Sequence, residues 1–156
     1  MIILSHLSYP TLLFILFANT FNVSYSFADI LVLLFFSILP DLDFVYHIIK
    51  NRGSYDFSYR HHQWVSHWPI VYTPLLAALY FYPSQALLLV CIGIYSHFLL
   101  DTFMSGDGIM WLYPFSSKFY NFFGNGTRHK HGPEWFKVYS KKNIYKIDLL
   151  SFFTII

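Results

Sequence analysis

The chain has 156 residues, of which 56% are hydrophobic, 22% aromatic and only 12% charged, against about 25% charged in an ordinary soluble domain. Ten Lys and Arg against eight Asp and Glu give a formal net charge of +2. The length predicts one domain, and a soluble domain of this size does not need so apolar a composition. The single cysteine, Cys91, excludes an intrachain disulfide and a cysteine-based zinc site. These numbers argue against a soluble protein and predict a membrane protein.

Four apolar segments are predicted to be membrane-spanning helices. They are residues 9–21, 27–50, 64–82 and 83–104. The first is short, whereas the second exceeds the roughly 20 residues that cross the hydrocarbon core. Pro83 and Ser84 predict a tight hairpin between the last two helices. The closing residues 147–156 are too short to span alone, so they are either the start of a fifth helix or an interfacial end. The expected fold is an all-α, multi-pass transmembrane bundle of four or five helices.

The positive charges predict the orientation of this bundle. Every Lys and Arg lies in one of two polar segments, at about residues 50–63 and 104–146. Four spans put both segments on one side, which the positive-inside rule makes the cytoplasmic side of a bacterial-type inner membrane. The N-terminus is then cytoplasmic too. A cleaved signal peptide is the alternative for residues 1–28, because "SFA" at its end resembles a signal-peptidase site. Against cleavage, no Lys or Arg precedes Lys50.

Three clusters of ionisable residues interrupt the apolar segments, and such residues are costly in lipid and typical of functional sites. They are Asp41 and Asp43 in "ILPDLD", His61, His62 and His67 in "HHQWVSH", and His97 and Asp101 in "YSHFLLD". Each cluster also has a purely structural interpretation. The first could end a helix at the interface, the second could join neighbouring tryptophans in an interfacial belt, and the third could be a buried pair.

The predicted topology brings all three clusters to one depth, because the second span ends, the third begins and the fourth ends on the same side. A further histidine just before the first span arrives there as well. Histidines and carboxylates that converge from facing helices form a recurring type of metal site. With no thiolate, the donors suit Zn, Mn or Fe. The candidate ligands are His6, Asp41, His62, His67, His97 and Asp101.

Six candidate ligands exceed the four that one zinc ion takes, so the sequence predicts one or two divalent ions, with the surplus residues supporting the ligands. A bound metal would lower the pKa of water toward ~7 and polarise a carbonyl or phosphoryl oxygen. Asp43 or Asp101 would act as the general base or would orient an imidazole. A depth near the lipid headgroups suits a phosphoester or acyl bond of a lipid-borne or small-molecule substrate. The non-enzymatic alternative is a small transporter or lipid-binding protein with a structural metal or polar site.

The C-terminal part of the chain is basic and aromatic. Residues 104–146 hold seven Lys or Arg against Asp107 and Glu134, a net charge of +5. This composition favours attraction to anionic lipid headgroups. No recognisable nucleic-acid-binding fold accompanies it. We divide the chain into a membrane-embedded hydrolase-like part, residues 1–123, and this basic C-terminal segment, residues 124–156.

The order of the motifs resembles a known family. "LPDLD", then His62 and His67 in an HxxxxH spacing, then "YSHFLLD" and "WLYPF" are similar to the YdjM-like membrane-bound, metal-dependent hydrolases, described as LexA-regulated inner-membrane proteins. The resemblance covers about residues 1–123 and includes a histidine near the N-terminus, in the place of His6. It implies a metal-dependent hydrolase of the inner membrane, with a distant likeness to zinc-dependent phospholipase C enzymes.

Two stretches depart from the family pattern. The family's central motif is close to HRGxTHS, whereas this chain reads "HQWVSHW" from His62 to Trp68, so the Arg, the Gly and the final Ser are missing. After Asp101 the family has a Thr-Pro-x-Gly turn, and this chain has "MSGDGIMWLYPF". The departures affect residues around the candidate ligands and leave the ligands themselves in place.

Overall fold

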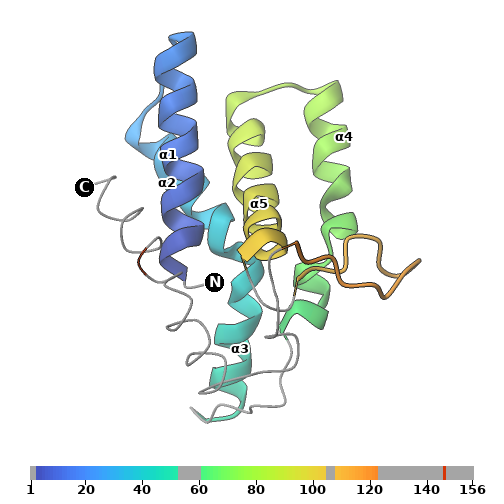
Figure 1. Ribbon diagram of the computed structural model, residues 1–156. Helices are drawn as coiled ribbons and strands as arrows, with labels where there is room; N and C mark the ends of the chain where they lie inside the picture. The colour runs from blue at the N-terminus through green and yellow to red at the C-terminus, as the bar shows by residue number, and fades with distance from the viewer. Residues whose placement is uncertain (1–2, 53–60, 105–107, 123–145, 147–156) are drawn as a thin grey trace.

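The computed structural model describes residues 3–52, 61–104, 108–122 and 146, and the secondary structure in this part of the chain is helical (Figure 1). The α-helices are α1 (Ile3–Phe21), α2 (Phe27–Ile38), α3 (Leu42–Lys50), α4 (Thr73–Phe81) and α5 (Gln85–Met104). Short 3-10 helices are η1 (Leu39–Asp41), η2 (His61–Gln63), η3 (Val65–His67) and η4 (Pro69–Tyr72). No strand occurs among the described residues, so the all-α prediction is confirmed. Nearly all of the C-terminal segment 124–156 lies outside them.

One helix in the described part of the chain is long and apolar enough to cross a membrane, Gln85–Phe103. The predicted span at 27–50 is instead divided into α2 and α3 by η1, because Pro40 has no N–H for a regular α-helical hydrogen bond. The predicted span at 64–82 begins with 3-10 turns, and its apolar helical part, Pro69–Phe81, is shorter than a span. The predicted start of the first helix, near residue 9, is wrong, because the helix begins at Ile3.

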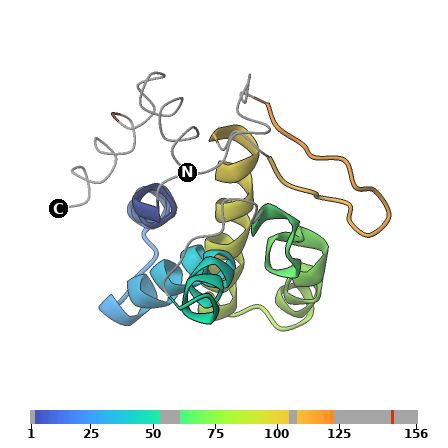
Figure 2. The same cartoon turned by 90° about the horizontal axis from the view of Figure 1, so that it is seen from below.

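Helices α2 and α5 form the main helix pair, and α1 packs against both of them. Viewed along the helices, α1 and α2 lie on one side of α5 and α4 lies on the other (Figure 2). The contact between α2 and α5 is close at Gly93. A Cβ there would lie 2.9 Å from the backbone nitrogen of Ser37 and 3.0 Å from the carbonyl oxygen of Leu33. Only glycine lets the two backbones approach this closely.

Two apolar clusters form the core. One joins Phe14 and Ala18 of α1 to Leu33 of α2 and Leu89 of α5. The other contains Ile94, Phe98 and Ile109, and it lies next to the ionisable residues. The outward face of α1 is also apolar, with Leu13 60% and Leu16 55% exposed. An apolar face of this kind is costly in water and suits lipid.

Hydrogen bonds join the α1–α2 connection to the starts of α2 and α5 at one end of the bundle. Ser26 and Asp29 form a capping box at the start of α2, with the Asp29 carboxylate accepting from the Ser26 N–H at 2.8 Å. The Gln85 side chain at the start of α5 donates to the carbonyl of Ser24 at 3.2 Å. The predicted hairpin is present, since α4 ends at Phe81 and α5 begins four residues later. These contacts fix the helices relative to one another at the end opposite the ionisable cluster.

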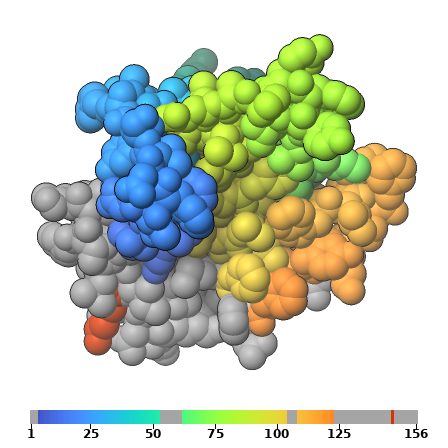
Figure 3. Space-filling model, turned by 90° about the horizontal axis from the view of Figure 1, so that it is seen from above, coloured from blue at the N-terminus to red at the C-terminus, as the bar shows by residue number. Residues whose placement is uncertain are grey.

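The segment after α5, residues 108–122, folds back on the helix. Backbone hydrogen bonds join Ile109 and Tyr120 at 3.1 and 2.9 Å, and the indole N–H of Trp111 donates to the hydroxyl of Thr102 at 2.8 Å. In the space-filling view, α5 lies between α1 and this segment (Figure 3). The residue next to Thr102 is Asp101, so the fold-back holds the end of α5 that carries part of the candidate site.

Candidate metal centre

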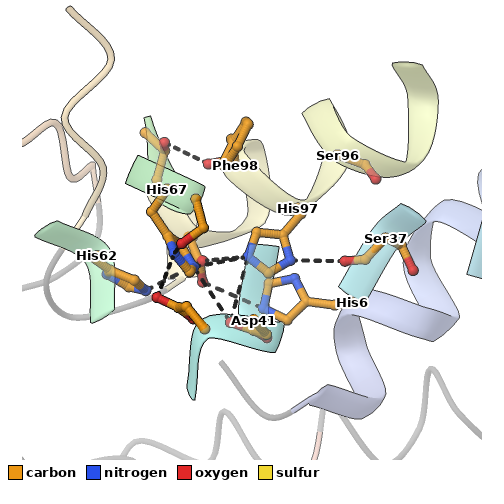
Figure 4. A network of polar contacts seen from close by, with 12 residues as sticks. His6, Ser37, Asp41, His62, His67, Ser96, His97 and Phe98 are labelled. Atoms are coloured by element: carbon orange, nitrogen blue, oxygen red, sulfur yellow. Dashed lines mark hydrogen bonds and ion pairs between the residues drawn. The ribbon is translucent and has the colours of Figure 1, made fainter. Parts of the chain in front are cut away.

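Seven ionisable side chains from six helical elements meet at one end of the bundle (Figure 4). They are His6 of α1, Asp41 of η1, Asp43 in the first turn of α3, His62 of η2, His67 of η3, and His97 and Asp101 of α5. Six of them form two groups, His6 with Asp41 and His97, and His62 with His67 and Asp101. Within each group, the candidate ligand atoms all lie within 4.8 Å of one another.

These seven residues are the candidate ligands and bases that the sequence suggests, and the structure brings all of them into one cluster. His6 reaches it from inside α1 and not from a segment before the first helix. The prediction of an interfacial belt does not describe His62 and His67, which are only 4% and 0% exposed. The side chain of His61 lies outside the described part of the structure.

The cluster is buried, and the burial of its charged groups is costly in free energy. His6, His97 and Asp101 are each at most 1% exposed, and the Asp41 side chain is the most open of the three carboxylates at 18%. A buried carboxylate is costly unless it is paired or coordinates a metal. Within the described residues, the ion pairs of these carboxylates all go to imidazoles. The buried carboxylates and the imidazoles that contact them therefore form a compact polar group of the kind that can coordinate a metal.

Asp101 lies at the centre of the cluster. Its Oδ1 is 3.4 Å from Nε2 of His6. Its Oδ2 is 3.4 Å from Nε2 of His62 and 3.2 Å from Nε2 of His97. The last pair is one helical turn apart on α5, as the four-residue spacing predicts. One carboxylate thus contacts three imidazoles, and its two oxygens have different neighbours.

The two carboxylates of the "PDLD" motif both contact His67. Oδ1 of Asp41 is 3.4 Å from Nε2 of His67 and 3.7 Å from Nε2 of His97. Oδ2 of Asp43 is 3.6 Å from the other ring nitrogen of His67, Nδ1. The hydroxyl of Ser66 lies 3.2 Å from the same Nδ1. Asp41 therefore faces the cluster, whereas Asp43 approaches His67 from behind and can orient its ring.

The ring of His97 is held in a single tautomer. Its Nδ1 lies 2.8 Å from the carbonyl oxygen of Ser37, and a carbonyl only accepts, so Nδ1 carries the proton and donates it. Nε2, which faces Asp101 and His67, is then left with its lone pair when the ring is neutral. This is the arrangement found for histidines that ligate metals, where a backbone carbonyl commonly fixes the ring.

Pro40 explains why the carbonyl of Ser37 is available. In a 3-10 helix the N–H of residue 40 would bond to the carbonyl of residue 37, and proline has no N–H to give. The motif thus breaks α2, turns Asp41 into the cluster and frees an acceptor for His97. Sequence reasoning used the kink and missed the acceptor, although a proline three residues after Ser37 is the signal that predicts it.

Gly93 is a second residue that sequence reasoning missed. It lies four residues before His97, so both are on the face of α5 that meets α2. The close approach at Gly93 brings His97 within hydrogen-bonding distance of the Ser37 carbonyl. The signal was a lone glycine on the same face as a histidine within an apolar helix, a position where a packing role is common.

The loop that carries His62 and His67 is fixed by aromatic side chains. The hydroxyl of Tyr72 donates to the carbonyl of Ser66 at 3.0 Å, and the indole N–H of Trp68 donates to the carbonyl of Gln63 at 3.1 Å. The Trp68 ring packs against the ring of Tyr113 at 4.1 Å between centroids. These contacts position a loop that lacks the Arg and Gly of the family motif.

The residues present fit a divalent metal ion. The donors are imidazole nitrogens and carboxylate oxygens, the set that Zn, Mn and Fe accept. The Nε2 atoms of His6, His62, His67 and His97 all face an aspartate oxygen in the cluster. His6 and His97 stack at 4.0 Å between ring centroids, which places two candidate ligands side by side.

Comparison with known proteins agrees with the apolar composition. No curated protein and no solved structure matches the chain. A family model described as YdjM inner membrane protein matches residues 1–155. The match extends beyond the residues 1–123 over which the motifs themselves show the resemblance. The chain belongs to the YdjM inner membrane protein family.

Proposed function

We propose that this protein is a membrane-bound, metal-dependent hydrolase that cleaves a phosphoester or acyl bond of a membrane-associated substrate. The observation that carries the proposal is the convergence of four imidazoles and three carboxylates from α1, η1, α3, the η2–η3 loop and α5. Histidine–aspartate pairs that only stabilise a fold do not require seven ionisable groups in one buried cluster. Enzymes that use a metal ion for hydrolysis bind it with imidazole nitrogens and carboxylate oxygens, the groups found here. Membership of an inner-membrane family supports a lipid environment.

In the proposed reaction, a bound divalent metal supplies Lewis acidity and a nucleophilic water at neutral pH. The ligands are His6, Asp41, His62, His67, His97 and Asp101. Asp43 keeps the proton on Nδ1 of His67 and so holds that ring in position. Asp101 would ligate the metal beside His6, His62 and His97, and either Asp43 or Asp101 would serve as the general base.

The substrate is proposed to enter beside Asp41, the most exposed carboxylate of the cluster. Trp64 and Val65, which are 39% and 51% exposed, lie on the same loop as His62 and His67. Apolar and aromatic side chains next to buried polar ligands suit a substrate with a lipid part and a polar bond to cleave. We place the activity in residues 1–123, because every proposed ligand lies there.

We further propose a multi-pass arrangement in the inner membrane, in which α1, α2 and α4 accompany α5 in the bilayer. The exposed apolar side chains of α1 and α4, among them Leu16 and Leu76, would then face lipid. The basic segment after α5 would lie at anionic headgroups on the cytoplasmic side. The cluster would open to that side, and the N-terminus would lie there as well.

The proposed activity predicts that His62→Ala abolishes hydrolysis. The full-length protein, purified in detergent, would be loaded with Zn²⁺ or Mn²⁺ and assayed on phosphoesters, acyl esters and phospholipids in mixed micelles. We expect a chelator to remove the activity and the metal to restore it. His62→Ala should lower kcat/KM by at least about 100-fold, since it removes a ligand that faces the buried carboxylate.

His47→Ala is the matched control, because His47 lies on α3 and bonds to Asn51 and not to the cluster. This variant should retain hydrolysis. A metal-loaded protein that cleaves none of the substrates, yet loses its metal in the His62 variant, would favour the non-enzymatic alternative with a structural metal. Hydrolysis that survives in His62→Ala would contradict the proposed site.

The proposed orientation predicts which loops are reachable from outside the cell. Single cysteines would replace Ser117 or Ser24, both exposed, in a Cys91→Ala background. We expect the Ser117 variant to react with a membrane-impermeant thiol reagent only after permeabilisation, and the Ser24 variant to react in intact cells. The reverse pattern would invert the topology and would place the cluster on the outer side of the membrane.

A further inference from the structure

The cluster contains more ligands than one ion can use, and they divide into two sets. His6, Asp41 and His97 form one set, and His62, His67 and Asp101 form the other, with no residue in common. Each set alone offers three donors, the number that a catalytic zinc ion takes from protein while keeping a further position open. A single ion bound by one set would leave the three candidate ligands of the other set unused.

The two sets are joined by their carboxylates. Asp101 belongs to the second set, but its Oδ1 is 3.4 Å from His6 of the first. Its Oδ2 is 3.4 Å from His62 of its own set and 3.2 Å from His97 of the first. This carboxylate therefore contacts histidines of both sets, as a group shared by two ions would, and paired catalytic metals lie about 3.5–4 Å apart.

Asp41 of the first set also contacts a histidine of the second set. Its Oδ1 is 3.4 Å from Nε2 of His67 in the second. In addition, Nε2 of His67 lies 3.4 Å from Nε2 of His97. The two sets are therefore adjacent, as two neighbouring ions require.

Charge also distinguishes one ion from two. Metal-ligating imidazoles are neutral, so the seven side chains contribute the −3 of Asp41, Asp43 and Asp101. Each divalent ion adds two positive charges, so a cluster that holds two ions attracts an anionic substrate more strongly than a cluster that holds one. A pair of ions thus matches a phosphoester better than a neutral acyl ester.

From these contacts we infer that the cluster holds two divalent ions that share the carboxylate of Asp101, and that the substrate is an anionic phosphoester. One ion would be held by His6, His97 and Asp41, and the other by His62 and His67, with the carboxylate of Asp101 shared between them. This inference rests on the proposed function, because it assigns the ions and the substrate class of that same site.

The test is the metal stoichiometry of the full-length protein in detergent, after removal of all metal and titration with Mn²⁺. We expect two Mn²⁺ per chain and the electron paramagnetic resonance signal of an exchange-coupled pair. His62→Ala and His6→Ala, which affect opposite sets, should each bind one ion per chain and show the signal of an isolated ion. Metal-loaded wild type should cleave a phosphomonoester or phosphodiester at least about tenfold faster, in kcat/KM, than the matched acyl ester.

One ion per chain in the wild type would overturn the two-ion inference and leave the proposed hydrolase standing. Two ions without magnetic coupling would overturn the sharing of Asp101. Faster cleavage of the acyl ester would overturn the substrate class. No bound metal at all would overturn the proposed function itself. Circular dichroism of each variant distinguishes a lost ligand from a lost fold, and His47→Ala, outside the cluster, should still bind two ions.

Discussion

Replacing Asp101 with asparagine is expected to abolish metal binding. Asp101 contacts the Nε2 atoms of His6, His62 and His97 at 3.2–3.4 Å and is 1% exposed. Asparagine keeps the shape of the side chain and removes its charge. Loss of a residue that merely supports a ligand lowers metal affinity by about 10–100-fold, so loss of this central carboxylate should lower it by more than about 100-fold. Isothermal titration of the metal-free protein measures the change.

Asp29→Asn is the matched control for this substitution. Asp29 is also an aspartate in a helical segment, and its carboxylate accepts hydrogen bonds from Ser26 at the far end of the bundle. The control should bind metal as the wild type does, with only a small loss of stability from the weakened capping box. Full metal affinity in Asp101→Asn would remove Asp101 from the site.

A leucine at position 93 is expected to separate α2 from α5. Even a Cβ at Gly93 would lie only 2.9–3.0 Å from backbone atoms of α2. Backbone atoms cannot move out of the way by a change of rotamer, as a flexible side chain can. Overpacking of this kind costs about 1–3 kcal/mol or more. The shift would also lengthen the 2.8 Å contact between His97 and the Ser37 carbonyl. We expect a lower Tm in detergent together with weaker metal binding.

Ala86→Leu introduces the same side chain on an exposed part of the same helix. It should change neither Tm nor metal affinity appreciably. If Gly93→Leu lowers the Tm but leaves metal affinity intact, then the close packing of α2 and α5 supports the fold without positioning His97. If the two leucine variants behave alike, the close approach at Gly93 has no role in stability.

Several parts of this structure could be predicted from the sequence. Ionisable residues in apolar segments are expensive, so they mark a site before any coordinates are known. The four-residue spacing of His97 and Asp101 fixed their mutual contact, because helix geometry alone determines it. The common depth of "PDLD", His67 and "YSHFLLD" followed from counting helices. The family resemblance rested on the same motifs, and the family match agrees with it.

Other parts could not be predicted, because they depend on contacts between segments far apart in the chain. Hydropathy treats residues 64–82 as one apolar run, yet two prolines and side-chain hydrogen bonds make its first part a series of 3-10 turns. The acceptor for His97 is the backbone carbonyl of Ser37; Pro40 indicates that this carbonyl is available, but the pairing with His97 depends on how α2 packs against α5. The position of His6 inside α1 depended on where that helix begins, and helix ends are the least certain feature of a sequence pattern.

During synthesis, His6 leaves the ribosome with the first helix, and Asp101 follows only after roughly 95 more residues, a delay on the order of ten seconds at typical translation rates. Throughout that interval the histidine of α1 lacks the carboxylate that lies 3.4 Å from it in the folded protein. A nascent chain that stops before α5 lacks His97 and Asp101, and with them the centre of the cluster. A metal bound by the cluster is therefore expected to be acquired after α5 has been synthesised and has packed against α1.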